Sequence, residues 1–188
     1  MAVAALTRWS SSTLRVLALT AVFVGAAGGD GAHAQAPTGD ADAKARFTIT
    51  VARFVQWPPT ALDGDAVPLK ICLLHNSPAL GAAFAVLDGQ RVAGRPVNVV
   101  SNPRDRRDCG LLFIDTSAAH GSAEAIAAVA DLPSLTLGAV DGFLSQGGMI
   151  ELANVNDMLR FDVNLKALRA ARLDMSSKAL RLARQVRN

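Results

Sequence analysis

The chain has 188 residues, of which 51% are apolar and 19% charged, with a formal net charge of +3. This composition excludes a disordered chain, which would be poor in apolar residues and rich in charge. The small net charge and the 5% of aromatic residues give no support for nucleic acid as a partner. Two cysteines and three histidines are too few to predict a metal site.

Residues 1–34 have the layout of an export signal. Arg8 and Arg15 supply a basic start, the stretch 14–27 is nearly continuous apolar sequence, and Ala32-His33-Ala34 is an A-x-A cleavage site. The alternative is a membrane anchor, but this apolar run is shorter than the roughly 20 residues needed to span a bilayer. We therefore predict a signal peptide cleaved after about Ala34 and an exported chain that does not itself span the membrane.

The next segment is predicted to begin as a flexible lead-in, because residues 35–42 are small and mostly polar. From Ala43 the pattern becomes that of an amphipathic helix, whose apolar face carries Phe47, Val51, Phe54 and Val55. Trp57-Pro58-Pro59 is predicted to end this helix, since proline disfavours helical angles in the residue before it.

Strand and helix patterns then alternate along the chain. Apolar or alternating runs predict strands at residues 68–75, 95–101, 109–115 and 134–138. Helices are predicted at residues 78–87, with Ser77 as the cap and Pro78 as the first helical residue, and at residues 118–130. Residues 102–108 are predicted to form a charged loop.

The last part of the chain predicts a hairpin followed by helices. Two runs, 148–152 and 158–163, are joined by a segment rich in Asn and Asp, which tolerate left-handed turn conformations. Asn164 is predicted to cap a helix to Ala171, and Ser176 or Ser177 a last helix to about Val186. The whole order predicts an α/β fold: a single Rossmann-like mixed sheet with helices on both faces and a C-terminal β-hairpin plus helices.

Catalytic and cofactor motifs are weak in this sequence. The turn after the first strand carries one glycine where a dinucleotide fingerprint needs three, and there is no Walker A lysine, so no cofactor is predicted. Ser117 lacks the glycines of a nucleophile elbow, and with His120 it is interpreted as ordinary polar surface. His75 and Asp115 follow predicted strands at their carboxyl ends, where ligand sites of α/β folds cluster. They are the candidate ligand-binding residues; the alternative for both is a structural role.

Basic residues gather at the C-terminus. Between Lys166 and Arg187, seven Lys and Arg stand against Asp174. In the predicted last helix they recur at every third position and form a stripe of Lys178, Arg181, Arg184 and Arg187. One interpretation is a solvated helix face; the other is a contact with an acidic partner or with anionic lipid headgroups.

The two cysteines are the most specific chemical feature. An exported chain meets an oxidising compartment, and no third thiol competes with Cys72 and Cys109. These conditions predict a disulfide between them, and the alternative is two buried free thiols. Bridging two adjacent strands would strain the geometry unless one cysteine lies at a strand end, and Cys109 opens its predicted strand.

Several segments together resemble the YfiR/HmsC-like family of small periplasmic proteins, over about residues 43–186. They are Phe54-Val-Gln-Trp-Pro58, Leu69–Leu74 with Gly94–Val97, Cys109–Ile114, Gly142-Phe143 with Gly147–Ile150, and Arg160–Asn164 with Ser176–Ala183. Each segment is weak by itself, and their order and spacing carry the resemblance.

The resemblance implies a periplasmic regulator rather than an enzyme. Family members hold an inner-membrane diguanylate cyclase inactive by contacting its periplasmic part, and they often dimerise. Cys72 and Cys109 match one cysteine pair of the family, while a second pair near Gly147–Met149 is absent here. We therefore expect a homodimeric repressor that lowers cyclic di-GMP and biofilm matrix. The alternative function is a periplasmic small-ligand sensor or hydrolase that uses the carboxyl ends of the strands.

Overall fold

The computed structural model describes residues 38–59, 61 and 67–188. The predicted signal peptide lies outside the described residues. The described part belongs to one compact unit, Gln35–Asn188. No helix within this part is long and apolar enough to cross a membrane.

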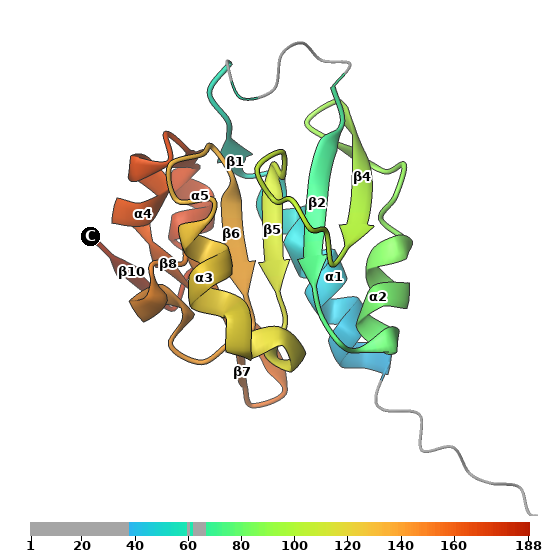
Figure 1. The fold of residues 1–188 in the computed structure, drawn as a ribbon. Helices are drawn as coiled ribbons and strands as arrows, with labels where there is room; N and C mark the ends of the chain where they lie inside the picture. The colour runs from blue at the N-terminus through green and yellow to red at the C-terminus, as the bar shows by residue number, and fades with distance from the viewer. Residues whose placement is uncertain (1–37, 60, 62–66) are drawn as a thin grey trace, which may run out of the picture. The chain divides into compact units, whose positions relative to one another are not determined.

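The fold is built on a mostly parallel sheet of eight strands, in the order β10-β8-β7-β6-β5-β2-β4-β3 (Figure 1). The strands are β2 (Leu69–Leu74), β3 (Arg91–Val92), β4 (Arg95–Ser101), β5 (Leu111–Ile114), β6 (Leu135–Gly138), β7 (Ile150–Val155), β8 (Met158–Asn164) and β10 (Gln185–Arg187). From β4 to β7 neighbouring strands are parallel, whereas β7 pairs with β8, and β3 with β4, in the antiparallel sense. The predicted α/β fold with a mixed sheet and a C-terminal hairpin is confirmed.

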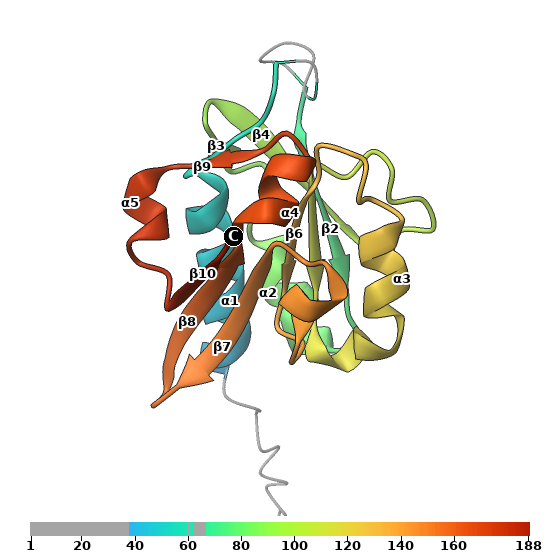
Figure 2. The ribbon, with the colours of Figure 1, turned by 90° about the vertical axis from the view of Figure 1, so that its left-hand side faces the viewer.

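Helices cover both faces of this sheet. The helices are α1 (Thr38–Ala52), α2 (Pro78–Ala85), α3 (Ser122–Ala127), α4 (Leu165–Ala170) and α5 (Ser177–Leu180), with 3-10 turns η1 (Thr116–Gly121) and η2 (Phe143–Gln146). Figures 1 and 2 show α3 on one face of the sheet and α1 on the other.

Strand β2 explains why both faces need cover. Its alternate residues Leu69, Ile71 and Leu73 join the core under α1 and α2, while Cys72 and Leu74 join a second core under α3. These five side chains are buried, and only Lys70 near the start of the strand is partly exposed, so both faces of β2 are covered along most of its length.

Local signals place several elements as predicted. The Ser77 side chain accepts from Leu80 N at the start of α2, and Asn164 accepts from Ala167 N at the start of α4. At the tip of the β7–β8 hairpin, Asn156 and Asp157 have φ of 51° and 59°. Two successive residues with positive φ match the two-residue turns that fit the twist of a hairpin.

Other boundaries differ from the sequence predictions. The first helix begins at Thr38, so that residues 38–42 form its first turns instead of a flexible lead-in. The predicted helix 118–130 consists of η1 and the shorter α3. A small second sheet, β1 (Val55–Gln56) paired with β9 (Asp174–Met175), was not predicted, because two-residue strands leave no periodicity.

The predicted last helix to Val186 is wrong. After α5 ends at Leu180, the chain turns and forms β10, which runs parallel to β8. Arg184 secures this turn: its backbone N–H donates to the Phe161 carbonyl, and its guanidinium binds Asp162 with Nε–Oδ1 at 3.0 Å and Nη2–Oδ2 at 2.6 Å. Asp162 is 3% exposed, and this bidentate pairing supplies the counter-charge it needs.

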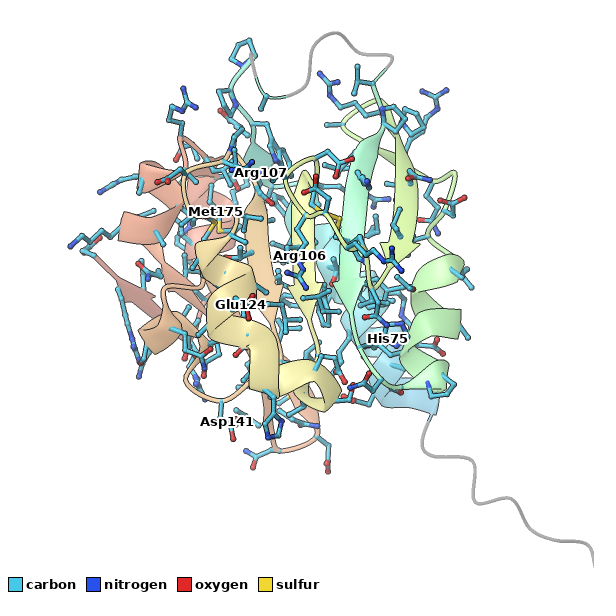
Figure 3. The ribbon with its side chains drawn as sticks, in the orientation of Figure 1. His75, Arg106, Arg107, Glu124, Asp141 and Met175 are labelled. Atoms are coloured by element: carbon cyan, nitrogen blue, oxygen red, sulfur yellow. A yellow bond between two sulfur atoms is a disulfide. The ribbon has the colours of Figure 1, made fainter. Side chains whose placement is uncertain are left out.

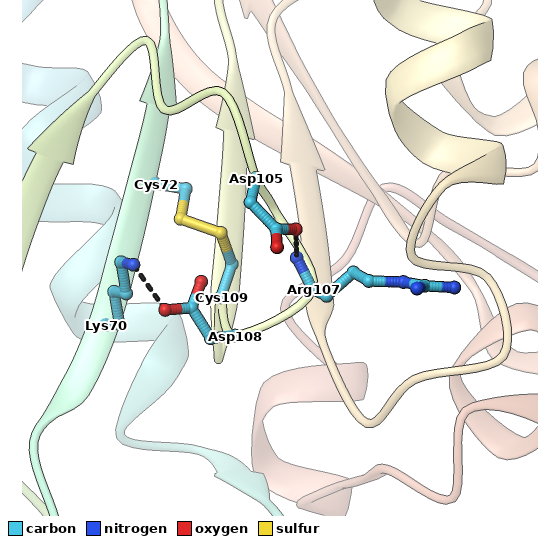
Figure 4. The surroundings of a disulfide bond; sticks show 6 residues. All are labelled: Lys70, Cys72, Asp105, Arg107, Asp108 and Cys109. Carbon is cyan, nitrogen blue, oxygen red and sulfur yellow. Dashed lines mark hydrogen bonds and ion pairs between the residues drawn. A yellow bond between two sulfur atoms is a disulfide. The ribbon is translucent and has the colours of Figure 1, made fainter.

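The predicted disulfide joins Cys72 and Cys109, whose Cα atoms are 5.8 Å apart (Figure 4). Cys109 lies two positions before the first residue of β5, outside the strand ladder, so the chain there can approach β2 without distorting the sheet. The bridge is buried in the core under α3.

We predict that the disulfide contributes about 4 kcal/mol to the free energy of unfolding, because it closes a loop between residues 37 positions apart. Urea titration of the oxidised protein and of the Cys72→Ala/Cys109→Ala variant measures this difference. Reductant should destabilise the natural protein and leave the double variant unchanged. Equal unfolding free energies for the two proteins would contradict the prediction.

Candidate functional site

The carboxyl ends of the central strands form the candidate site. From β2 the chain crosses through α2 to β4, and from β5 it crosses through α3 to β6, toward the opposite edge of the sheet. Because α2 and α3 lie on opposite faces, the winding reverses between the neighbouring strands β2 and β5. Such a reversal leaves a crevice beyond the strand ends, where ligands of open α/β sheets bind.

His75 follows β2 at this edge, and both its backbone and its ring form hydrogen bonds. Its backbone N–H donates to Asn102 Oδ1 at 3.0 Å, and its carbonyl accepts from Asn102 Nδ2 at 2.9 Å. Nδ1 of the ring lies 2.7 Å from the Ser77 carbonyl, and Nε2 lies 3.3 Å from the Ser101 hydroxyl. Both ring nitrogens therefore have protein partners, and His75 joins the ends of β2 and β4 to α2.

Gly81 of α2 leaves room for the His75 ring because it has no side chain. A Cβ added at Gly81 would lie 2.7 Å from Cε1 of His75, so the imidazole rests directly on the helix backbone. Only glycine permits this approach without moving the ring.

Asp115 follows β5 at the same edge and is also fully engaged. Its Oδ2 accepts from Ser117 N at 3.0 Å and from the Ser117 hydroxyl at 2.6 Å, while Oδ1 accepts from Lys44 Nζ at 3.2 Å. Lys44, on α1, forms a second ion pair with Asp40 at 2.9 Å. This network ties the first helix to the end of a central strand.

Charge and hydrogen bonding set the protonation of this network. Burial by itself would raise the pKa of Asp115, but the hydrogen bonds from Ser117 and the charge of Lys44 outweigh burial and lower the pKa. Burial likewise disfavours the charged form of Lys44, yet the contacts with Asp40 and Asp115 raise its pKa. Both groups stay ionised at neutral pH, and Asp115 is a weak base.

The two sequence-predicted ligand residues thus lie at one sheet edge, with their polar atoms committed to the fold. The pocket at this edge is lined by other side chains, among them Asn76, Arg106 and His120, and has a volume of about 320 Å³. The sequence showed the charged loop 102–108 but gave no reason to single out Arg106, because the other residues of the pocket come from segments distant in the sequence, after β2 and β5.

The C-terminal basic residues do not form the single helical stripe that was predicted. Lys178 lies on α5, Arg181 just after it, and Arg187 in β10, and all three are exposed. Arg184 is bound to Asp162. Among these basic residues lie two exposed apolar side chains, Leu182 at 68% and Val186 at 39% exposure.

Comparisons with known proteins agree with the resemblance seen in the sequence. A sequence model described as YfiR/HmsC-like matches residues 41–184. No curated protein matches the chain. A conserved domain protein from Vibrio cholerae O1 biovar eltor has a similar structure, with a TM-score of 0.53 at 9% identity over 78% of this chain and 60% of that one. At this identity the likeness shows the fold alone.

A second solved structure, the ABC domain in complex with L-Trp from Streptococcus pneumonia, has a TM-score of 0.49 at 13% identity over 76% of this chain. The chain spans 60% of the length of both of these structures.

We predict that Asp115→Asn lowers the unfolding free energy at pH 7 by about 1–3 kcal/mol, because it removes one of the two charge partners of Lys44 and weakens a part-buried network. The lowered folded-state pKa of Asp115 means that its stabilisation is present above the unfolded value of about 3.9 and is lost as pH falls through the folded-state value. Urea titrations at pH 7 and pH 3 should therefore show the gap between the two proteins narrowing in acid.

Asp141→Asn, which neutralises an exposed carboxylate in the neighbouring loop after β6, is the matched control and should change stability little at either pH. A gap for Asp115→Asn that is the same at both pH values would refute the role assigned to its charge.

Proposed function

Because the chain belongs to the YfiR/HmsC-like family, we propose that it is a periplasmic regulatory binding protein that represses an inner-membrane diguanylate cyclase. It would contact the periplasmic part of the cyclase, lower cyclic di-GMP and so reduce biofilm matrix. The family match over residues 41–184 is the observation that carries the proposal. The export signal predicted from residues 1–34 supports a periplasmic location.

The geometry at the strand ends supports binding over hydrolysis. A hydrolytic serine needs a neighbouring base that can take its proton. The Ser117 hydroxyl points at Asp115, whose pKa is lowered and which is already paired with Lys44. Such a carboxylate is a poor proton acceptor near neutral pH, so this pair suits a structural contact.

The C-terminal surface supports an interaction with an acidic partner. The basic side chains Lys178, Arg181 and Arg187 and the apolar side chains Leu182 and Val186 are all exposed in the C-terminal segment. Protein interfaces combine apolar contact area with charges that are complementary across the contact. We propose this surface, called here the C-terminal basic surface, as the contact with the cyclase. The proposal includes a homodimer, which the family resemblance implies.

We predict that deleting the gene raises cyclic di-GMP and biofilm matrix, because the cyclase loses its repressor. Mass spectrometry of cell extracts measures cyclic di-GMP, and expression of the full chain from a plasmid should restore the original level. An unchanged cyclic di-GMP concentration in the deletion strain would contradict the proposal.

We predict that Lys178→Glu/Arg181→Glu, expressed in the deletion strain, fails to restore repression, because it places two negative charges against an acidic partner. Arg104→Glu/Arg107→Glu is the matched control: it makes the same change of charge at two exposed positions of the loop 102–108. Immunoblots of periplasmic extracts establish that both variants accumulate. Full repression by the first variant would show that the C-terminal basic surface is not the contact.

A further inference from the structure

The crevice at the reversal between β2 and β5 has the form of a small-molecule site. Its volume of about 320 Å³ is at the lower end for ligand pockets. It is bounded by the last residue of β2, Leu74, and by the segments that follow β2, β4 and β5, which contribute Asn76, Asn102, Arg106, Ser117 and His120. Figure 3 shows Arg106 reaching in front of β5 from the loop between β4 and β5.

Arg106 is the unusual member of this lining. Its Nε is buried and has no hydrogen-bond partner, and no ion pair joins the guanidinium to any described residue. A buried N–H that is left unpaired costs free energy, and a guanidinium carries a charge as well. No carboxylate is among the residues that line the pocket. Asp115, which accepts from the lining residue Ser117, is paired with Lys44 instead of Arg106.

Hydrogen bonds connect the segments that form the walls of the crevice in the absence of a ligand. Asn76 links the two central strand ends: its backbone N–H donates to the Ser117 hydroxyl at 3.0 Å, and its Nδ2 donates to the Ser117 carbonyl at 2.7 Å. Asn102, which follows β4, connects the third segment to the other two through its hydrogen bonds with the His75 backbone. The site is therefore already formed, and binding a ligand would cost little conformational entropy for ordering loops.

His120 adds a second uncommitted donor. It lies in η1 on the wall that follows β5, and its ring makes no hydrogen bond with the described part of the chain. Leu74 and Ala118 give the lining an apolar portion. The lining therefore contains the guanidinium of Arg106, the imidazole of His120 and a small apolar surface.

We infer that this crevice binds a small anion whose carboxylate or phosphate group is held by Arg106. The planar guanidinium fork matches either group in a bidentate geometry, and no ion pair with a described residue occupies it. The volume favours a ligand of a few heavy atoms beyond the anionic group. This binding is a property of the protein alone and does not depend on the proposed repression of a cyclase.

The test is a pair of titrations on the purified protein, with inorganic phosphate and with succinate, in a buffer free of both groups. Calorimetry measures the affinity, and thermal unfolding measures the rise in midpoint that accompanies binding. We expect saturable binding of at least one probe and an affinity at least about tenfold weaker for Arg106→Gln, which loses the charge-assisted hydrogen bonds. Binding of only one probe would identify the anionic group.

Arg107→Gln is the matched control. It removes the same charge from the next position, whose side chain is exposed and outside the pocket lining, and it should bind as the natural protein does. Without anion, Arg106→Gln should unfold at the same or a higher temperature than the natural protein, because it removes an unpaired buried group. The inference is overturned if neither probe binds, if Arg106→Gln binds with unchanged affinity, or if Arg107→Gln loses affinity equally.

Discussion

The burial of strand β2 on both faces governs how the helices and the crevice are arranged. Leu69, Ile71 and Leu73 face one core and Cys72 and Leu74 the other, so neither face of the strand can be left to solvent. One face is covered by α1 and α2 and the other by α3 and the turns around it. The crossover helices α2 and α3 reach opposite faces because the winding of the chain reverses between β2 and β5. The crevice between β2 and β5 is the direct result.

The polar residues around that crevice divide into two groups. His75, Asn102, Asp115 and Ser117 satisfy one another or the backbone, and they hold three strand ends and the first helix together. Arg106 and His120 have no such partners among the described residues. Residues of the first group maintain the shape of the edge, while those of the second are available to a molecule from outside. This division matters more for function than the position of any one residue at a strand end.

The C-terminal segment links the proposed contact surface to the body of the fold. Ser176 N–H donates to the Phe54 carbonyl, the β1–β9 pair lies beside it, and Arg184 binds the buried Asp162. These contacts fix the ends of the segment that carries Lys178 and Arg181. An interface built on it would therefore be held by the central sheet rather than by a free tail.

The α/β architecture could be predicted from local signals in the sequence: the apolar runs of the central strands, the caps Ser77 and Asn164, and the turn Asn156-Asp157. It also predicted the disulfide, since a chain predicted to be exported would meet an oxidising compartment, and its two cysteines can pair only with each other. What it predicted of the site was the sheet edge: His75 and Asp115 lie there because parallel strands end together.

Tertiary structure decided the rest. Residues 181–187 have the spacing of a helix, but pairing with β8 and the Arg184–Asp162 bond outweigh the weak local preference of a short terminal segment. Whether a polar side chain is committed or free depends on partners distant in sequence, such as Lys44 for Asp115, 71 positions away. Arg106 and Arg107 are neighbours of the same type in the sequence, and only the tertiary structure buries Nε of Arg106 without a partner while leaving Arg107 exposed.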